Sequence, residues 1–270
     1  MDVIRNLEKS LSYAWNLGHV KPFLYLYLLA AVGLGALAAI GFGALAAALA
    51  APAGLASLIP TAAWLVLLLI LLAIVVAIGS LLAIATVALQ SQGKKKAFGE
   101  AKKRLLGLIS VMFAVILVSF AANWAVETLL GRRVAGASYS GGGALAAVAG
   151  TIVSIAVSCA FVFTPYFVIL RGRKALDALS ASAKLFVKKP AAVFLVFLTE
   201  VVVGIALVIA SLVPLVLAIA YAASAGATSL LVSGLLVFLS LFVLLLGISF
   251  TQTFGAAFLA NALVELDRKR

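Results

Sequence analysis

Charged residues are scarce in this sequence. Only 10% of its 270 residues are Asp, Glu, Lys or Arg, whereas 66% are hydrophobic. Soluble domains carry about 25% charged residues, because their surfaces face water. The composition, with a mean hydropathy of +1.29, therefore excludes a soluble globular domain and predicts a protein surrounded by lipid.

Cysteine and histidine are almost missing. Cys159 is the one cysteine and His19 the one histidine, which excludes an intramolecular disulfide and a thiolate metal cluster. We identify no His-Glu metal motif, no Ser-His-acid set and no phosphate-binding loop, since the glycines at Gly141–Gly143 lack the following Lys. We therefore expect no enzymatic activity, no cofactor and no metal, and we interpret His19 as a lipid headgroup contact.

Long apolar stretches, by contrast, are abundant. A membrane-spanning helix needs about 20 apolar residues, and six stretches reach that length. They are Pro22–Ala50, Ala63–Gln90, Leu105–Leu130, Ala144–Leu170, Ala191–Ala220 and Leu230–Phe254. The sequence predicts an all-α polytopic membrane protein in which a single domain over residues 1–270 crosses the membrane six times.

Positive charge is concentrated in alternate connections between these stretches and at the two ends of the chain. Four segments hold eighteen of the twenty Lys and Arg residues: Arg5–Lys21, Lys94–Arg104, Arg171–Lys189 and Arg268–Arg270. By the positive-inside rule, these segments and both termini face the cytoplasm of a multi-pass cell-membrane protein. The first apolar stretch is too long for a signal peptide, so no cleaved leader is expected.

The first three basic segments have apolar residues at helical spacing and cations on the opposite face. We predict that each forms an interfacial amphipathic helix before a transmembrane hairpin. Leu11–Pro22 aligns with Leu179–Pro190, and the middle segment aligns more weakly. The alignment favours three parallel repeats, at about 1–91, 92–171 and 172–270; the alternative is that interfacial helices resemble one another by composition alone.

The cations of the two central segments are the predicted contacts for anionic lipid headgroups. They are Lys94, Lys95, Lys96, Lys102, Lys103, Arg104, Arg171, Arg173, Lys174, Lys184, Lys188 and Lys189. A net charge of +12 would indicate a nucleic-acid partner in a soluble protein. Topology accounts for the charge here, so membrane lipids are the expected partners and nucleic acid is not.

The stretch Phe163–Pro190 contains an apolar span that ends near a proline, a short polar link, and an Ala-Leu-x-x-Ser helix that enters another span. This pattern resembles a superfamily of six-helix membrane proteins, which includes the membrane domain of some glycerophosphodiester phosphodiesterases and uncharacterised archaeal and bacterial relatives. Leu7–Pro22 and Ala256–Arg270 are similar to the ends of that family. The resemblance implies architecture only, because the diesterase activity belongs to a separate domain that needs several histidines and carboxylates.

Small residues at four-residue spacing predict where helices pack. One line is Ala31, Gly35, Ala39, Gly43 and Ala47, and a second is Ala146, Gly150, Ser154 and Ser158. We expect both lines at helix contacts inside the bundle. Pro165 and Pro214 each remove a backbone donor inside a span and are expected to bend it, with Ser211 satisfying part of the freed backbone near Pro214.

Glu200 is the strongest chemical candidate. It lies about ten residues, or roughly 15 Å, into the fifth span, near the middle of the hydrocarbon core. A carboxylate is costly there, so it is expected to face the bundle or to be protonated. Ser80, Ser154 and Ser158 lie at similar depth. Glu200 is therefore either part of a proton or cation relay, or a protonated acid bonded to a facing serine or carbonyl.

A second polar group is predicted near the outer face. Asn123 and Glu127 are one helical turn apart, and Arg132 and Arg133 follow the span. They form either an interfacial ion pair, which contributes little to stability, or an ion vestibule. On the inner side, Gln252, Asn261 and Glu265 are expected to pack against neighbouring segments.

Three functional hypotheses follow. The favoured one is a non-enzymatic membrane-embedded scaffold or partner subunit, with a protein partner or a second copy of the chain. The alternative is a permease for a small solute or ion that uses Glu200. The third is a component of a larger translocation channel, for example for nucleic acid, that exploits the basic cytoplasmic face.

Overall fold

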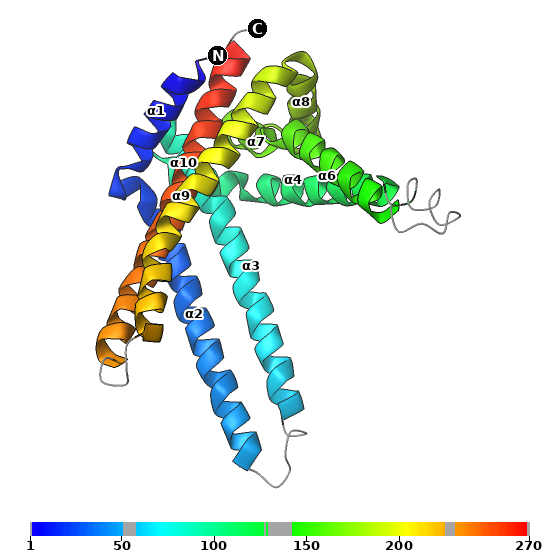
Figure 1. Ribbon diagram of the computed structural model, residues 1–270. Helices are drawn as coiled ribbons and strands as arrows, with labels where there is room; N and C mark the ends of the chain where they lie inside the picture. Colours follow the sequence, from blue (N-terminus) through cyan, green and yellow to red (C-terminus); the bar gives the residue numbers. More distant parts are fainter. Residues whose placement is uncertain (1, 51–57, 127, 129–141, 225–229, 269–270) are drawn as a thin grey trace. The chain divides into compact units, whose positions relative to one another are not determined.

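The computed structural model describes residues 2–50, 58–126, 128, 142–224 and 230–268 (Figure 1). Its regular elements in these residues are helices. They are α1 (Val3–Ala14), α2 (Leu17–Ala50), α3 (Leu58–Ser91), α4 (Ala97–Val126), α6 (Gly142–Phe161), α7 (Thr164–Arg171), α8 (Ala175–Lys188), α9 (Pro190–Ser224) and α10 (Leu230–Arg268). Six helical spans are long and apolar enough to cross a membrane. The predicted all-α polytopic membrane fold is confirmed.

The fourth span, Val148–Arg171, is divided into two helices. Helix α6 ends at Phe161, and α7 begins at Thr164 with Pro165 in its first turn, where a missing N–H costs nothing. The break confirms the prediction made for Pro165. Helix α9, in contrast, continues through Pro214.

Ser211 does not compensate for Pro214 as expected. Proline deprives the carbonyl four residues earlier, that of Ala210, of its donor. The Ser211 hydroxyl donates instead to the Val208 carbonyl, at 2.8 Å, and the Ser240 hydroxyl donates to the carbonyl of Pro214 itself, at 3.1 Å.

Two of the three predicted basic helices are separate elements, α1 and α8. Each is followed by a local interruption of the helix. After α1, the Asn16 side chain accepts a hydrogen bond from the Gly18 N–H, at 2.9 Å. After α8, Lys189 precedes Pro190, which disfavours helical backbone before it. The Lys94–Arg104 segment has no such interruption. Helix α4 begins at Ala97 and runs without interruption into its span, so the prediction of a separate middle helix was wrong.

Two compact units make up the chain. Unit 1 contains Met1–Ser10, Ala85–Val203 and Gly255–Arg270, and unit 2 contains Leu11–Ile84 and Gly204–Phe254. Because each unit combines segments distant in sequence, neither corresponds to one of the proposed repeats. The three-repeat division of a single domain stays a prediction.

In unit 1, α4 and α6 run side by side; α4 packs with α7 and α8, and α6 packs with α8 (Figure 1). Phe163, Phe167 and Leu108 are fully buried in this core. The end of α10 is also buried over residues 256–263, as expected for a stretch that is apolar on every side except at Asn261.

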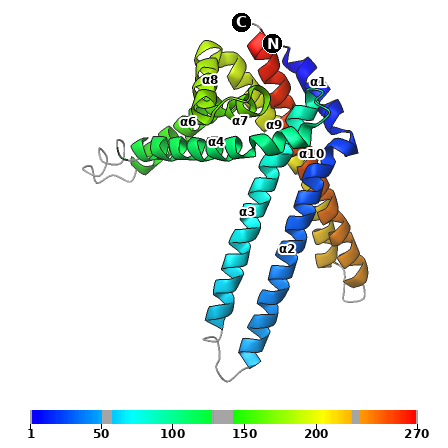
Figure 2. The same cartoon turned by 180° about the vertical axis from the view of Figure 1, so that it is seen from behind.

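In unit 2, α2 and α3 run side by side (Figure 1, Figure 2). Their contact uses glycines opposed by leucines: Gly33 lies against Leu72, and Gly41 lies against Leu65. The predicted contact line on α2, from Ala31 to Ala47, is instead exposed at each of its five positions. That packing prediction was wrong, because another face of the same helix carries the glycines that receive leucine side chains.

Candidate functional site

Glu200 lies on α9 in unit 1 and is half-buried. Its carboxylate lies against α10, where a Cβ added to Gly255 would be 3.2 Å from Glu200 Oε1. It also interacts electrostatically with Tyr166 of α7, whose side chain is buried. Among the residues that the structure describes, no hydrogen bond to the Glu200 carboxylate is formed. The site is therefore a carboxyl group between three helices with unused hydrogen-bonding capacity.

The serines predicted to accompany Glu200 lie elsewhere. Ser80 is half-buried on α3 in unit 2. Ser154 donates its hydroxyl hydrogen to Asn123 Oδ1, at 2.9 Å, and Ser158 is exposed on α6. The expected hydrogen bond between Glu200 and a facing serine is thus not formed by Ser154 or Ser158.

The Asn123–Ser154 bond joins α4 to α6, the two helices of one hairpin. It combines a residue assigned to the outer vestibule with one assigned to the membrane interior, so Asn123 has a packing role. The other vestibule residues, Glu127, Arg132 and Arg133, lie outside the described residues.

Polar contacts connect α1 to the end of α10. The backbone N–H of Asp2 and the Asn6 side chain donate to the Glu265 carboxylate, at 3.0 and 2.5 Å. Asn261, one turn before Glu265, accepts from Gln92 at 2.7 Å and donates to Ser10 Oγ at 3.2 Å. The four-residue spacings of Asp2 with Asn6 and of Asn261 with Glu265 could have indicated two facing polar stripes.

These contacts border a cavity of about 300 Å³ whose lining has both signs of charge. Arg5, Lys9 and Arg268 contribute the cations, and Asp2 and Glu265 contribute the carboxylates. Because the carboxylates already bind α1, the network's evident role is to hold α1 against α10. Gln252, also predicted to pack, is exposed.

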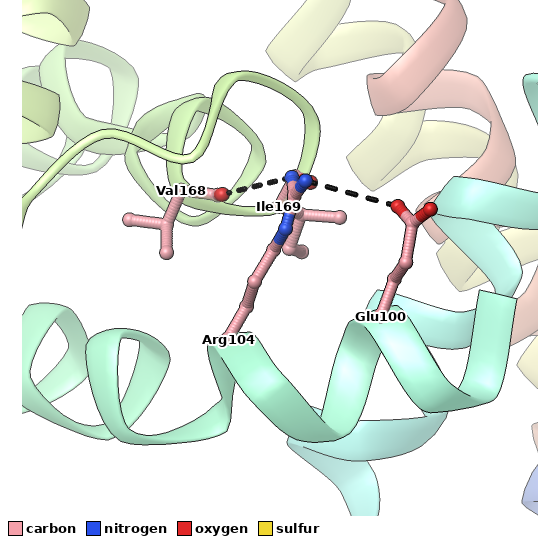
Figure 3. Close-up of polar contacts among 4 residues, drawn as sticks. All are labelled: Glu100, Arg104, Val168 and Ile169. Atoms are coloured by element: carbon pink, nitrogen blue, oxygen red, sulfur yellow. Dashed lines mark hydrogen bonds and ion pairs between the residues drawn. The ribbon is translucent and has the colours of Figure 1, made fainter.

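Arg104 binds α7 rather than projecting freely toward headgroups (Figure 3). Its Nη1 donates to the carbonyls of Val168, at 3.4 Å, and Ile169, and its Nη2 lies 3.7 Å from Glu100 Oε2. The last carbonyls of a helix lack partners within it and carry partial negative charge. Hydrogen bonds to charged groups contribute about 1.5–3 kcal/mol each, so Arg104 is an important link between α4 and α7.

Three other predicted headgroup cations also make contacts within the protein. Arg171 bonds to Asp267 at 2.6 Å, Lys189 Nζ donates to the Leu266 carbonyl at 2.7 Å, and the Arg173 guanidinium lies 5.1 Å from the centre of the Phe167 ring. The remaining eight are exposed: Lys94, Lys95, Lys96, Lys102, Lys103, Lys174, Lys184 and Lys188. Headgroup contact by these residues stays a prediction.

His19 is stacked on Tyr13, with ring centroids 3.8 Å apart and an interplanar angle of 5°. Its Nδ1 lies 3.0 Å from the Tyr13 carbonyl oxygen. Burial raises the pKa of Tyr13 to about 12, so the phenol stays neutral at physiological pH. The pair stabilises the corner between α1 and α2, and the headgroup role of His19 stays a prediction.

Comparison with known proteins gives no match to a family model, to a curated protein or to a solved structure. The resemblance to the six-helix superfamily therefore stays a prediction.

Proposed function

We propose that this integral membrane protein is a non-enzymatic scaffold, a subunit that binds a transmembrane helix of a partner protein or of a second copy of the chain. The observation that supports the proposal is the exposed line of small residues on α2. Gly35 and Gly43 have open space where a Cβ would be, and Ala31, Ala39 and Ala47 are also exposed. Helix α3 contacts the opposite side, at Gly33 and Gly41.

Small residues matter for helix association in lipid. Lipid chains are as apolar as leucine, so helices associate mainly where short side chains let the backbones approach closely. A partner in the hydrocarbon core is itself expected to be helical, because its backbone polar groups must be satisfied internally. The α2 line lies within a span, Leu17–Ala47, which makes a transmembrane helix the fitting partner.

Two adjacent alanines give a matched test. Both Ala38 and Ala39 are exposed, but Ala39 is on the small-residue line and Ala38 is about 100° away around the helix. Ala39→Leu is expected to weaken association at least about tenfold, or ~1.4 kcal/mol, because the longer side chain separates the backbones. Ala38→Leu should have little effect.

The measurement is native mass spectrometry and co-purification after gentle solubilisation. The unaltered chain and Ala38→Leu should retain the partner or form an oligomer, and Ala39→Leu should not. A monomeric unaltered chain, or equal association of the two variants, would contradict the scaffold function.

A second candidate function is ion permeation through Glu200. It is favoured by the carboxyl group, which has no hydrogen-bond partner among the described residues and interacts with Tyr166. Ionisable residues within a span commonly mark ion or proton pathways. Tyr166 lies on α7, the helix that begins after the break in the fourth span.

Glu200→Gln is expected to abolish proton or monovalent-cation flux in proteoliposomes, because glutamine cannot exchange a proton or balance a cation. Glu8→Gln, which removes an exposed carboxylate outside the spans, is the control and should leave flux unchanged. Both variants should elute from gel filtration like the unaltered protein. Flux that survives Glu200→Gln would reject the permease role.

A further inference from the structure

Helix α8 borders an open groove of about 800 Å³ in unit 1. Its lining is polar apart from one alanine. The lining residues are Arg173, Asp177, Ser180, Ala181, Lys184, Lys188 and Lys189. Four cations therefore surround one space, accompanied by one carboxylate and one hydroxyl.

Helix α8 is fixed in the orientation that presents this groove. Ala178, Ser182 and Leu185, about 100° around the helix from the groove, are buried. The Ser182 hydroxyl donates to the Ala160 carbonyl at the end of α6, at 2.7 Å. Lys184 and Lys188 are one turn apart and exposed, so they project along the same side of a helix whose rotation is set by burial.

Two of the four cations are positioned by contacts outside the groove. The Arg173 guanidinium lies over the Phe167 ring, and Lys189 Nζ bonds to the Leu266 carbonyl. Restricting side chains in advance reduces the entropy lost when a ligand binds. The exposed lysines of the Lys94–Arg104 segment do not line this groove, which distinguishes the four cations from positive charge in general.

We propose that this groove binds the phosphate of an organic phosphate that carries hydroxyl groups. Ammonium and guanidinium groups are the usual protein ligands of phosphate, and Asp177 and Ser180 supply acceptors for hydroxyls on the rest of the ligand. The source is either an anionic lipid headgroup or a free organic phosphate. The inference does not depend on the proposed scaffold function.

The Asp177 carboxylate lines the same groove as the four cations. It repels a phosphate bound by Lys184 and Lys188, whereas asparagine removes the charge and keeps an oxygen that accepts hydrogen bonds from ligand hydroxyls. Asp177→Asn is therefore expected to strengthen binding severalfold, a gain that a misfolded protein would not show. Lys184→Gln with Lys188→Gln should weaken binding about tenfold or more, since each cation near a phosphate contributes appreciably. Lys102→Gln with Lys103→Gln removes the same charge elsewhere and should change binding less than twofold.

Binding is measured on the full chain in uncharged detergent, by native mass spectrometry with phosphatidylinositol against phosphatidylcholine, and by calorimetry with myo-inositol 1-phosphate. Preferential retention of phosphatidylinositol identifies a headgroup site, whereas saturable binding of inositol phosphate alone identifies a soluble ligand. Either result supports the proposal only if the variants also change the binding affinity as predicted: a gain in Asp177→Asn, a loss in the Lys184 and Lys188 pair, and little change in the Lys102 and Lys103 pair. Equal losses in the two lysine pairs, no gain in Asp177→Asn, or no binding of either probe would overturn it.

Discussion

Gly247→Ala is expected to lower the free energy of unfolding by about 3 kcal/mol, the upper part of the range for overpacked cores. Gly247 lies on α10 where it meets α9 in unit 2. A Cβ at this position would overlap Ser211 Cβ and lie 2.6 Å from Ser211 Oγ. The overlap involves an atom attached directly to the backbone, so a side-chain rotation cannot relieve it, and the two helices would have to separate.

Gly234 provides the matched control on the same helix. It has no neighbouring atom within 4 Å of an added Cβ, so Gly234→Ala should be neutral or stabilise the helix by about 0.5–1 kcal/mol. Gly79→Ala is a second comparison, because its clash is with Leu26 Cδ1, the end of a rotatable side chain. Unfolding by SDS in mixed micelles measures all three. Equal midpoints for Gly247→Ala and Gly234→Ala would contradict the α9–α10 packing.

The spans could be predicted from sequence because the bilayer imposes a length and a composition on them. Packing could not, because a face that contacts lipid and a face that contacts a helix are equally apolar. On α2, the four-residue line from Ala31 to Ala47 was a plausible contact, yet Gly33 and Gly41 make the contact with α3. Periodicity identified small residues but not which of two small-residue faces is covered.

The same distinction applies to the polar residues. The depth of Glu200 follows from counting along one helix, whereas Tyr166 and Gly255, its neighbours, come from segments distant in sequence. Arg104 was grouped with the headgroup cations because its partners are main-chain carbonyls at the end of α7, where the left-handed Gly172 ends the helix. Side-chain patterns do not reveal such backbone acceptors.

Single cysteines introduced at the two sides of the membrane are expected to differ almost completely in their reaction with an impermeant reagent. The positive-inside rule predicts that Glu8 and Lys95 lie on the cytoplasmic side. Pro60 and Ser224, near the opposite ends of α3 and α9, are predicted to lie on the outer side. All four positions are exposed. Cys159, the single native cysteine, is 1% exposed and is replaced by alanine, so each single-cysteine variant reports one position.

The most direct measurement is therefore the reaction of these four variants with a membrane-impermeant maleimide, in intact cells and after permeabilisation. Cysteine at Pro60 and Ser224 should react in intact cells, and cysteine at Glu8 and Lys95 only after permeabilisation. Reaction of Glu8 and Lys95 from opposite sides, or of Pro60 and Lys95 from the same side, would contradict a chain that crosses the membrane six times and keeps its basic segments in the cytoplasm.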